Sequence, residues 1–165
     1  VQTLISAIPN ADIGVVQACA FALGNIGSAE AINSLENLLD DPEPQVRLHS
    51  VIALGKIGGS STVPLLKRML TDIEPNVRWD AAIGLAKQKD SSGRSILLDL
   101  LNRKYLNSFP NIDEKEKVQV MLVAISVAHF IQNPELKTRL MDINNNEDNL
   151  KIREAARIAL GKFII

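Results

Sequence analysis

The chain has 165 residues, of which 46% are apolar and 22% charged, and its 18 basic and 19 acidic side chains leave a formal net charge of −1. This composition excludes a disordered tail, a collagen-like fibre and, with a single cysteine, a disulfide-stabilised scaffold. The balanced charge argues against nucleic-acid binding through bulk positive charge. The longest apolar run, residues 118–131, contains Gln119 and His129 and is too short to cross a membrane.

The apolar residues recur at helical spacing and never alternate with a period of two, so the sequence predicts helices and no strands. We predict ten helices, arranged as four antiparallel pairs between two single helices. The single helices are residues 1–9 and 150–165, and the pairs occupy residues 10–40, 41–71, 72–105 and 113–145. We interpret residues 1–165 as a single array, and we expect a longer parent chain that continues at the N-terminal end.

Internal repetition is the strongest feature of this sequence. The segment that begins at Val15 aligns without gaps with segments at Val46 and Val77, 31 residues apart each time, and a related segment begins at Ile152. Such a period indicates a stack of repeated helical pairs, in which each pair buries the apolar face of its neighbour. The second helices supply three predicted core columns, again 31 apart: Leu35, Leu66 and Leu97; Leu38, Met69 and Leu100; Leu39, Leu70 and Leu101.

The first helix of each pair has recognisable ends and a distinctive composition. Pro44 and Pro75 fit the first turn of a helix, where no amide donor is needed, and Gly58 follows the last turn. Alanine, glycine and serine within these helices allow neighbouring helices to approach closely, as a regular stack requires.

The motif D-x-x-x-x-V-R-x-x-A-x-x-A-L-G-x-I-G, at Asp41–Gly58 and in more divergent form at Asp72–Lys89, resembles the short HEAT-like repeats of bacterial proteins, which are also named after the phycobilin lyases. The resemblance implies an all-α, right-handed α-solenoid of stacked antiparallel helix pairs. In such arrays the second helices line a concave face that commonly binds partners, and a recurrent arginine braces adjacent repeats. The family includes scaffolds, lyase subunits, hydroxylases and DNA-repair enzymes.

The recurrent arginine corresponds here to Arg47, Arg78 and Arg153, whereas Val16 replaces it in the first copy. We expect Arg47 and Arg78 to pair with the acids that begin each repeat, Asp41 and Asp72, because a guanidinium can bind a carboxylate through two bonds. The alternative for these arginines is an anion-binding site.

Charge is unevenly distributed along the chain. Residues 1–46 contain six acids and no lysine or arginine, whereas the remainder is basic. Residues 31 apart lie on adjacent helices, so we expect Glu36 to lie beside Lys67 and Arg68 to lie beside Asp99. This mixed pattern favours a self-paired surface over a basic groove, and we therefore expect no nucleic-acid partner.

The insertion after the third pair, residues 102–115, carries Tyr105 and Phe109 and is our favoured site of specialised function, since long loops with apolar content often bind partners. Trp79 occupies a position expected at the edge of exposure. It is either a binding anchor or a residue packed locally, for example against the insertion, and local packing is favoured.

Two histidines and one cysteine provide no metal-ligand cluster, and the chain lacks the paired His-Glu dipeptides that hold iron in HEAT-like hydroxylases. His49 and Asp80 occupy equivalent positions in successive repeats, and we expect a structural hydrogen bond between them. We predict no catalytic residues, no cofactor and no metal.

The sequence therefore predicts a non-catalytic scaffold, expected in the cytoplasm, that binds a protein partner through the concave face of the array and the insertion. Two alternatives remain: a nucleic-acid-binding protein of the HEAT-like glycosylase type, and a phycobilin-lyase-like chromophore chaperone. The predicted contact residues are Asn33, Glu36, Asn37, Lys67, Arg68, Trp79, Asp99, Asn102, Arg103, Tyr105 and Phe109.

Overall fold

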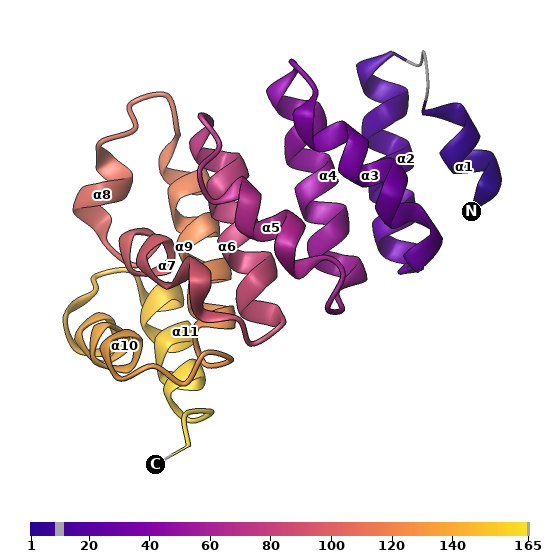
Figure 1. Cartoon of the computed structure of the whole chain (residues 1–165). Coiled ribbons are helices and arrows are strands. Elements are labelled where there is room, and N and C mark those ends of the chain that lie inside the picture. Colours follow the sequence, from indigo (N-terminus) through magenta and orange to yellow (C-terminus); the bar gives the residue numbers. More distant parts are fainter. Residues whose placement is uncertain (9–11, 165) are drawn as a thin grey trace. The chain divides into compact units, whose positions relative to one another are not determined.

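The computed structural model describes residues 1–8 and 12–164, and within these ranges every regular element is helical. The fold is an all-α solenoid of stacked helical pairs (Figure 1). The described helices form two compact units, Val1–Asp90 and Ser91–Ile165. The boundary between the units falls inside the predicted pair 72–105, so the division into four pairs and the single array stay predictions.

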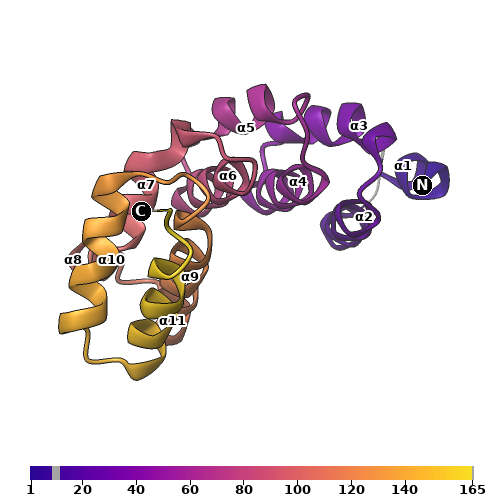
Figure 2. The same cartoon turned by 90° about the horizontal axis from the view of Figure 1, so that it is seen from below.

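The first unit contains two rows of helices (Figure 2). One row holds the first helices of three repeats, and the other row holds shorter second helices. The first helices are α2 (Ile13–Ile26), α4 (Pro44–Ile57) and α6 (Pro75–Lys87), and the second helices are α1 (Gln2–Ala7), α3 (Ile32–Asn37) and α5 (Val63–Met69). Two 3₁₀ turns, η1 (Ala29–Ala31) and η2 (Leu38–Asp40), flank α3.

The second unit begins with the 3₁₀ turn η3 (Ser91–Gly93) and contains five α-helices. Its helices α9 and α11 lie side by side, and α10 packs against α11 (Figure 1). The five helices are α7 (Arg94–Leu100), α8 (Arg103–Asn107), α9 (Glu114–Ala128), α10 (Pro134–Asn146) and α11 (Leu150–Leu160).

The described residues thus form eleven α-helices, one more than the sequence predicts. The additional helix is α8, which lies in the insertion. The Asn102 side chain begins this helix by accepting a hydrogen bond from the Lys104 amide at 3.0 Å, a local cap that the apolar spacing of the sequence does not reveal.

Proline, glycine and capping residues explain where several helices begin and end. Pro44 and Pro75 occupy the first turns of α4 and α6, and Gly27 and Gly58 end α2 and α4 with φ values of 70° and 68°, which glycine adopts without strain. Helix α9 begins with a capping box in which Asp113 accepts from the Glu116 amide at 2.8 Å.

The predicted core columns are buried in both units. Leu35 and Leu66 are fully enclosed in the first unit, and Leu97, Leu100 and Leu101 are enclosed in the second. The exceptions are Leu38 and Leu70, which are half-buried and pack at the margin of the core of the first unit. No helix of the described ranges is long and apolar enough to span a bilayer.

Candidate protein-binding surface

The recurrent arginines are called the ladder arginines below. One of them, Arg47, joins two successive repeats of the first unit. The Arg47 guanidinium donates from Nε and Nη2 to the two carboxylate oxygens of Asp72, at 2.8 and 3.0 Å, and from Nη1 to the carbonyl of Asp41 at 2.9 Å. Asp72 also accepts from the Glu74 amide at 2.8 Å. Arg47 of one repeat therefore fixes the loop that begins the next repeat.

The electrostatics of this pair are those of a semi-buried salt bridge. The bond to Asp72 raises the pKa of Arg47 and outweighs its desolvation. Burial alone would raise the pKa of Asp72, but the hydrogen bonds from Arg47 and the Glu74 amide outweigh it, so the pKa is lowered and the carboxylate is ionised at neutral pH.

The other two ladder arginines differ from Arg47. Arg78 donates to the carbonyls of Asp72 and Ile73, at 2.7 and 2.9 Å, and so braces its own repeat. In Arg153 the Nε atom is buried and has no hydrogen-bond partner within the described residues. The Asp41 carboxylate accepts from the Glu43 amide, while its carbonyl receives Arg47.

The predicted contact residues of the first unit lie on the second helices. Asn33 and Asn37 on α3 are exposed and Glu36 is half-buried. Lys67 and Arg68 on α5 form ion pairs with Asp90 at 2.8 Å and with Asp40 at 3.4 Å.

The 31-residue spacing therefore predicts the wrong partner for Lys67. Glu36 forms no ion pair among the residues that the structure describes. Asp90 lies instead in the turn that follows α6, where its carboxylate is 2.8 Å from the Lys67 ammonium.

The prediction that Trp79 lies at the edge of exposure is wrong. Its side chain is only 3% exposed, and its neighbours along α6, from Ala81 to Ala86, are buried as well. A buried indole cannot anchor a partner from outside. The sequence alignment places Trp79 beside the arginine column, but it does not show how completely α6 is enclosed.

The expected hydrogen bond between His49 and Asp80 is also absent from the described residues. His49 Nδ1 lies 2.7 Å from the Gln45 carbonyl one turn earlier in α4. Burial raises the pKa of Asp80 to about 6, against the opposing positive charges of Lys87 and His49.

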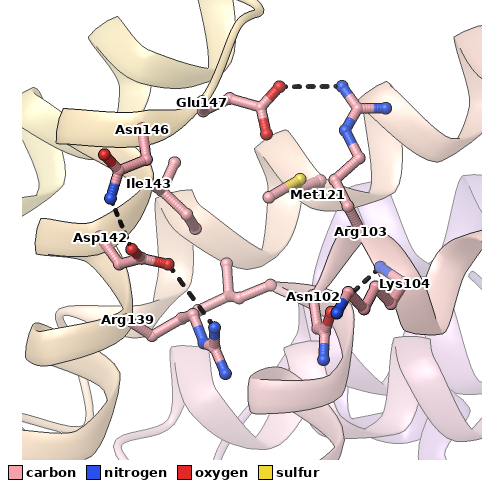
Figure 3. A pocket seen from close by; sticks show the side chains of 10 residues that line it. Asn102, Arg103, Lys104, Met121, Arg139, Asp142, Ile143, Asn146 and Glu147 are labelled. Atoms are coloured by element: carbon pink, nitrogen blue, oxygen red, sulfur yellow. Dashed lines mark hydrogen bonds and ion pairs between the residues drawn. The ribbon is translucent and has the colours of Figure 1, made fainter.

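The second unit contains a hollow of about 200 Å³ between the start of α8, α9 and α10 (Figure 3). Its floor is apolar and enclosed: Leu101, Met121 and Ile143 are each at most 5% exposed. Polar side chains form the rim, and Figure 3 shows Asn102, Arg103, Lys104, Arg139, Asp142, Asn146 and Glu147 around this floor.

Two groups of polar contacts organise the rim. The Arg103 guanidinium pairs with Glu147, at 3.1 Å, and with Glu114. Burial would lower the pKa of Arg103, but the bonds to Glu147 and Glu114 outweigh it and raise the pKa. On the opposite side Asp142 accepts from Asn146 at 2.8 Å and lies 3.7 Å from Arg139.

The remaining predicted residues of the second unit do not line this hollow. Asp99 is exposed and, with Asn102, Arg139 and Asp142, lines an adjoining depression between α7 and α10. Tyr105 and Phe109 of the insertion are half-buried, with their rings edge-to-face at a centroid distance of 5.1 Å.

Sequence reasoning missed five polar residues at the rim of the hollow: Lys104, Arg139, Asp142, Asn146 and Glu147. The spacing of α10 marks Leu136, Leu140 and Ile143 as its core face, so Arg139 and Asp142 were identifiable as flanking polar positions. The sequence could not show that Arg139 and Asp142 lie close to Asn102, because the insertion interrupts the 31-residue spacing. No group of three or more His, Cys, Asp or Glu side chains placed to hold a metal ion occurs within the described ranges.

Alignments with solved structures cover nearly the whole length of this chain. The CpcE and CpcF complex of phycocyanin lyase from Nostoc sp. PCC7120 aligns with a TM-score of 0.61 and 21% identity, over 98% of this chain and 74% of that one. YibA from Escherichia coli aligns with a TM-score of 0.66 and 25% identity, over 97% of this chain and 55% of that one. The chain thus spans about half the length of YibA.

A computationally designed armadillo repeat protein for modular peptide recognition aligns with a TM-score of 0.50 and 20% identity, over 98% of this chain and 81% of that one. No curated protein matches the sequence. The model of the family described as HEAT repeats matches residues 1–86 and 33–106, which together make up more than half of the chain. The chain therefore belongs to the HEAT-repeat family.

Proposed function

We propose that this chain is a non-catalytic scaffold that binds a segment of a partner protein on its second helices and insertion, with the hollow of the second unit as the principal contact. The observation that carries this proposal is the composition of the hollow. A hollow of about 200 Å³ is lined by polar side chains that ion pairs and hydrogen bonds already hold in place, so a polar side chain of a partner can enter it and meet ordered donors and acceptors.

The organisation of the rim supports a protein partner because it is already ordered. Arg103 is held by two carboxylates and Asp142 by an amide, so a partner would meet side chains that lose little conformational entropy on binding. Lys104 is exposed, and the Arg139 side chain is 40% exposed at its weak pair with Asp142. These two cations favour a partner segment that carries an acidic side chain.

The charges of the first unit favour a protein partner over a nucleic acid. Lys67 and Arg68 are paired with Asp90 and Asp40, so the cations of α5 are balanced by neighbouring acids rather than arranged as a stripe. Nucleic-acid binding depends on unpaired cations that neutralise successive phosphates. The exposed amides of Asn33 and Asn37 offer donors and acceptors to a peptide backbone instead.

The test is affinity capture from lysate with the full 165-residue chain, followed by mass spectrometry and by titration with the recovered partner. We expect Lys104→Glu with Arg139→Glu to weaken binding at least ten-fold, because the changes reverse the charge at the rim. Lys162→Glu, an equally exposed charge reversal beyond the end of α11, is the matched control and retains binding.

Two further titrations with the full chain distinguish the alternatives. Salt-dependent binding of duplex DNA would replace this proposal with a nucleic-acid function, and a spectral change on mixing with a free bilin would replace it with a chromophore-lyase function. Capture of a partner that binds the double variant and the wild-type chain equally would also overturn the assignment of the hollow.

A further inference from the structure

The interface between α9 and α11 lacks the arginine that fills the corresponding interface of the first unit. In the repeat alignment, Val118 of α9 occupies the position of Arg47 of α4, and Leu122 occupies that of Val51. Arg47 reaches from α4 to the loop before α6, where it pairs with Asp72 at 2.8 Å. A valine is too short to reach the corresponding loop before α11, so α9 does not fill this space with a side chain of its own.

The carboxylate that begins the α11 repeat is instead bound from another direction. Glu147, which aligns with Asp72, pairs with Arg103 of α8 at 3.1 Å and accepts a hydrogen bond from the Asn149 amide at 3.2 Å. Arg103 lines the hollow of the second unit and does not line the space beside Val118. The contact between the repeats is therefore kept, while the space beside Val118 stays open.

This space is a groove of about 720 Å³ between α9 and α11, called the α9–α11 groove. Its apolar residues are Val118 and Leu122 on α9 and Leu150 at the start of α11. Val118 and Leu122 are half-buried, whereas Arg47 and Val51 at the aligned positions of α4 are 9% and 0% exposed. The volume falls within the roughly 300–1,000 Å³ that is usual for ligand sites.

Both helices that bound the α9–α11 groove belong to the second unit. In the row of first helices of the first unit, α4 lies between α2 and α6 (Figure 2). By the same geometry, a helix that followed α11 would lie beyond α11 and not over the groove. Leu150 is 71% exposed, and its aligned residue on α2, Ile13, is 43% exposed although α4 follows α2. This position of the repeat therefore stays exposed within a stack.

Two lysines flank the apolar side chains of the groove. Lys115 in the first turn of α9 and Lys151 in the first turn of α11 are exposed, and neither ammonium group forms an ion pair or a hydrogen bond with the residues that the structure describes. Glu114 also lines the groove, but its carboxylate pairs with Arg103. The positive ends of the α9 and α11 dipoles lie at the groove as well. An apolar centre is thus surrounded by positive potential.

The depth of the apolar side chains favours a peptide segment over a membrane surface. A bilayer contacts side chains that protrude, as Leu150 does, but Val118 and Leu122 are half-buried beside it. A peptide that inserts one apolar side chain can contact all three residues. The exposed lysines then meet carboxylates on either side of the inserted residue.

We propose that the α9–α11 groove binds a segment of a partner protein in which an apolar side chain lies between acidic residues. The apolar side chain contacts Val118, Leu122 and Leu150, in the space that the ladder arginine fills beside α4. The carboxylates of the segment pair with Lys115 and Lys151. This site is separate from the hollow of the second unit and does not depend on the function proposed for the hollow.

The probes are fluorescein-labelled peptides in which leucine, isoleucine, methionine or phenylalanine lies between two aspartates, with glycine and serine at both ends. We expect at least one of them to bind the full 165-residue chain saturably in fluorescence anisotropy, and to bind more weakly as the salt concentration rises. The same peptides with lysine in place of both aspartates, or with serine in place of the apolar residue, are expected not to bind.

Substitutions on the chain test the assignment to this groove. Val118→Arg fills the groove with the side chain that the aligned position of α4 carries, and it is expected to weaken binding at least ten-fold. Lys115→Glu with Lys151→Glu is expected to have the same effect, because the charges are reversed. The matched controls are Ile158→Arg, at an exposed apolar position of α11, and Lys162→Glu, and both retain binding. Far-UV circular dichroism verifies that each variant remains helical.

The proposal is overturned if no aspartate-flanked peptide binds, if the lysine-flanked peptides bind equally well, or if Val118→Arg or the double-glutamate variant binds as tightly as wild type. Vesicles of phosphatidylcholine and phosphatidylserine in a four-to-one ratio test the membrane alternative. Cosedimentation that Leu150→Ser abolishes would assign these residues to a bilayer and overturn the proposal. Self-association that Val118→Arg abolishes in sedimentation velocity would overturn it in favour of a second copy of the chain.

Discussion

At the scale of single residues, the most consequential contact is the one between Arg47 and Asp72. Both side chains are almost enclosed, at 11% and 6% exposure, and two parallel bonds join the guanidinium to the carboxylate. Such a pair costs desolvation when it forms, but the loss of one partner leaves a buried charge unbalanced. The pair thus sets the register of neighbouring repeats more than it adds net stability.

We predict that Asp72→Asn lowers the free energy of unfolding by about 2–4 kcal/mol at pH 7, because it leaves Arg47 without its counter-charge. Since the pKa of Asp72 is lowered in the folded state, its contribution is complete above the ordinary carboxylate pKa of about 4 and is lost as the pH falls below it. The difference between wild type and variant should therefore shrink in acid. Urea denaturation followed by the fluorescence of Trp79, the single tryptophan, measures both effects.

Arg47→Lys and Glu154→Gln are the controls for this prediction. The lysine keeps the charge but loses the two-bond geometry, so we expect an intermediate loss of stability. Glu154 pairs with Arg157 on the exposed surface of α11, where ion pairs add little, and its substitution should leave the urea midpoint unchanged. An Asp72→Asn variant as stable as wild type at pH 7 would contradict the ladder interpretation.

The contribution of Asp80 to the free energy of unfolding changes with pH in the opposite direction to that of Asp72. Its pKa of about 6 exceeds the ordinary value of about 4, because burial disfavours the ionised form. Between pH 4 and 6 the unfolded chain has released this proton while the folded chain retains it. The free energy of unfolding therefore falls as the pH rises through this window.

We predict that Asp80→Asn raises the free energy of unfolding at pH 7 by roughly 1–3 kcal/mol and removes the decline between pH 4 and 6. Urea midpoints measured at intervals across this pH range test the prediction. Asp99→Asn, an exposed carboxylate, is the control and should retain the decline. An unchanged slope in the Asp80→Asn variant would show that another group is responsible.

Arg103 illustrates how the insertion compensates for a divergent repeat. The ladder arginine is absent from the repeat that begins at α9, where Val118 occupies the aligned position. Arg103 nevertheless binds Glu147, which in turn accepts from the Asn149 amide at 3.2 Å. This arrangement reproduces that of Arg47, Asp72 and the Glu74 amide in the first unit.

At the scale of elements, close helix packing explains the small residues of the first helices. The backbones of α2 and α4 approach so closely at Gly24 that a Cβ atom there would meet the Ala53 backbone. A methyl group cannot be accommodated without displacing one helix, because the obstacle is main chain rather than a flexible side chain. Glycine is retained at this position despite its cost within a helix.

We predict that Gly24→Ala destabilises the chain by about 1–3 kcal/mol, because overpacking exceeds the gain of up to about 1 kcal/mol in helix propensity. Gly161→Ala is the matched control. It replaces a glycine whose added Cβ would meet only carbonyls of its own helix, at 3.5 and 4.0 Å, and it should be neutral or slightly stabilising. Thermal unfolding followed by circular dichroism compares the two variants, and equal melting temperatures would contradict the packing argument.

At the scale of the whole molecule, the described helices form two compact units. The first unit has a contiguous core from Ile8 to Leu85 that is built from its own helices. In a repeat protein, stability arises from each repeat and its nearest neighbours, so a block of repeats with its own core is able to fold independently.

We predict that residues 1–90 alone fold into a helical unit that unfolds cooperatively. Three first helices and three second helices provide the neighbours that each pair requires, and the Lys67–Asp90 ion pair is retained. Urea denaturation followed by circular dichroism should give a sigmoidal transition. As a control, residues 1–40 lack a complete neighbouring pair and should show little cooperative unfolding. A gradual transition for residues 1–90 would contradict the independence of this unit.

The helical pairs and the core columns were predictable from the sequence alone. Helical spacing, the 31-residue repeat and the proline and glycine boundaries are local properties, and they indicated ten helices and the burial of Leu35, Leu66 and Leu97. These features follow from sequence because neighbouring repeats impose the same environment on aligned positions.

Tertiary structure decided everything that departs from the repeat. It placed Asp90 rather than Glu36 beside Lys67, enclosed Trp79, and brought Arg103 to Glu147 across 44 residues of sequence. A periodic sequence predicts which positions are apolar or charged, but only the folded chain determines which residue each side chain contacts.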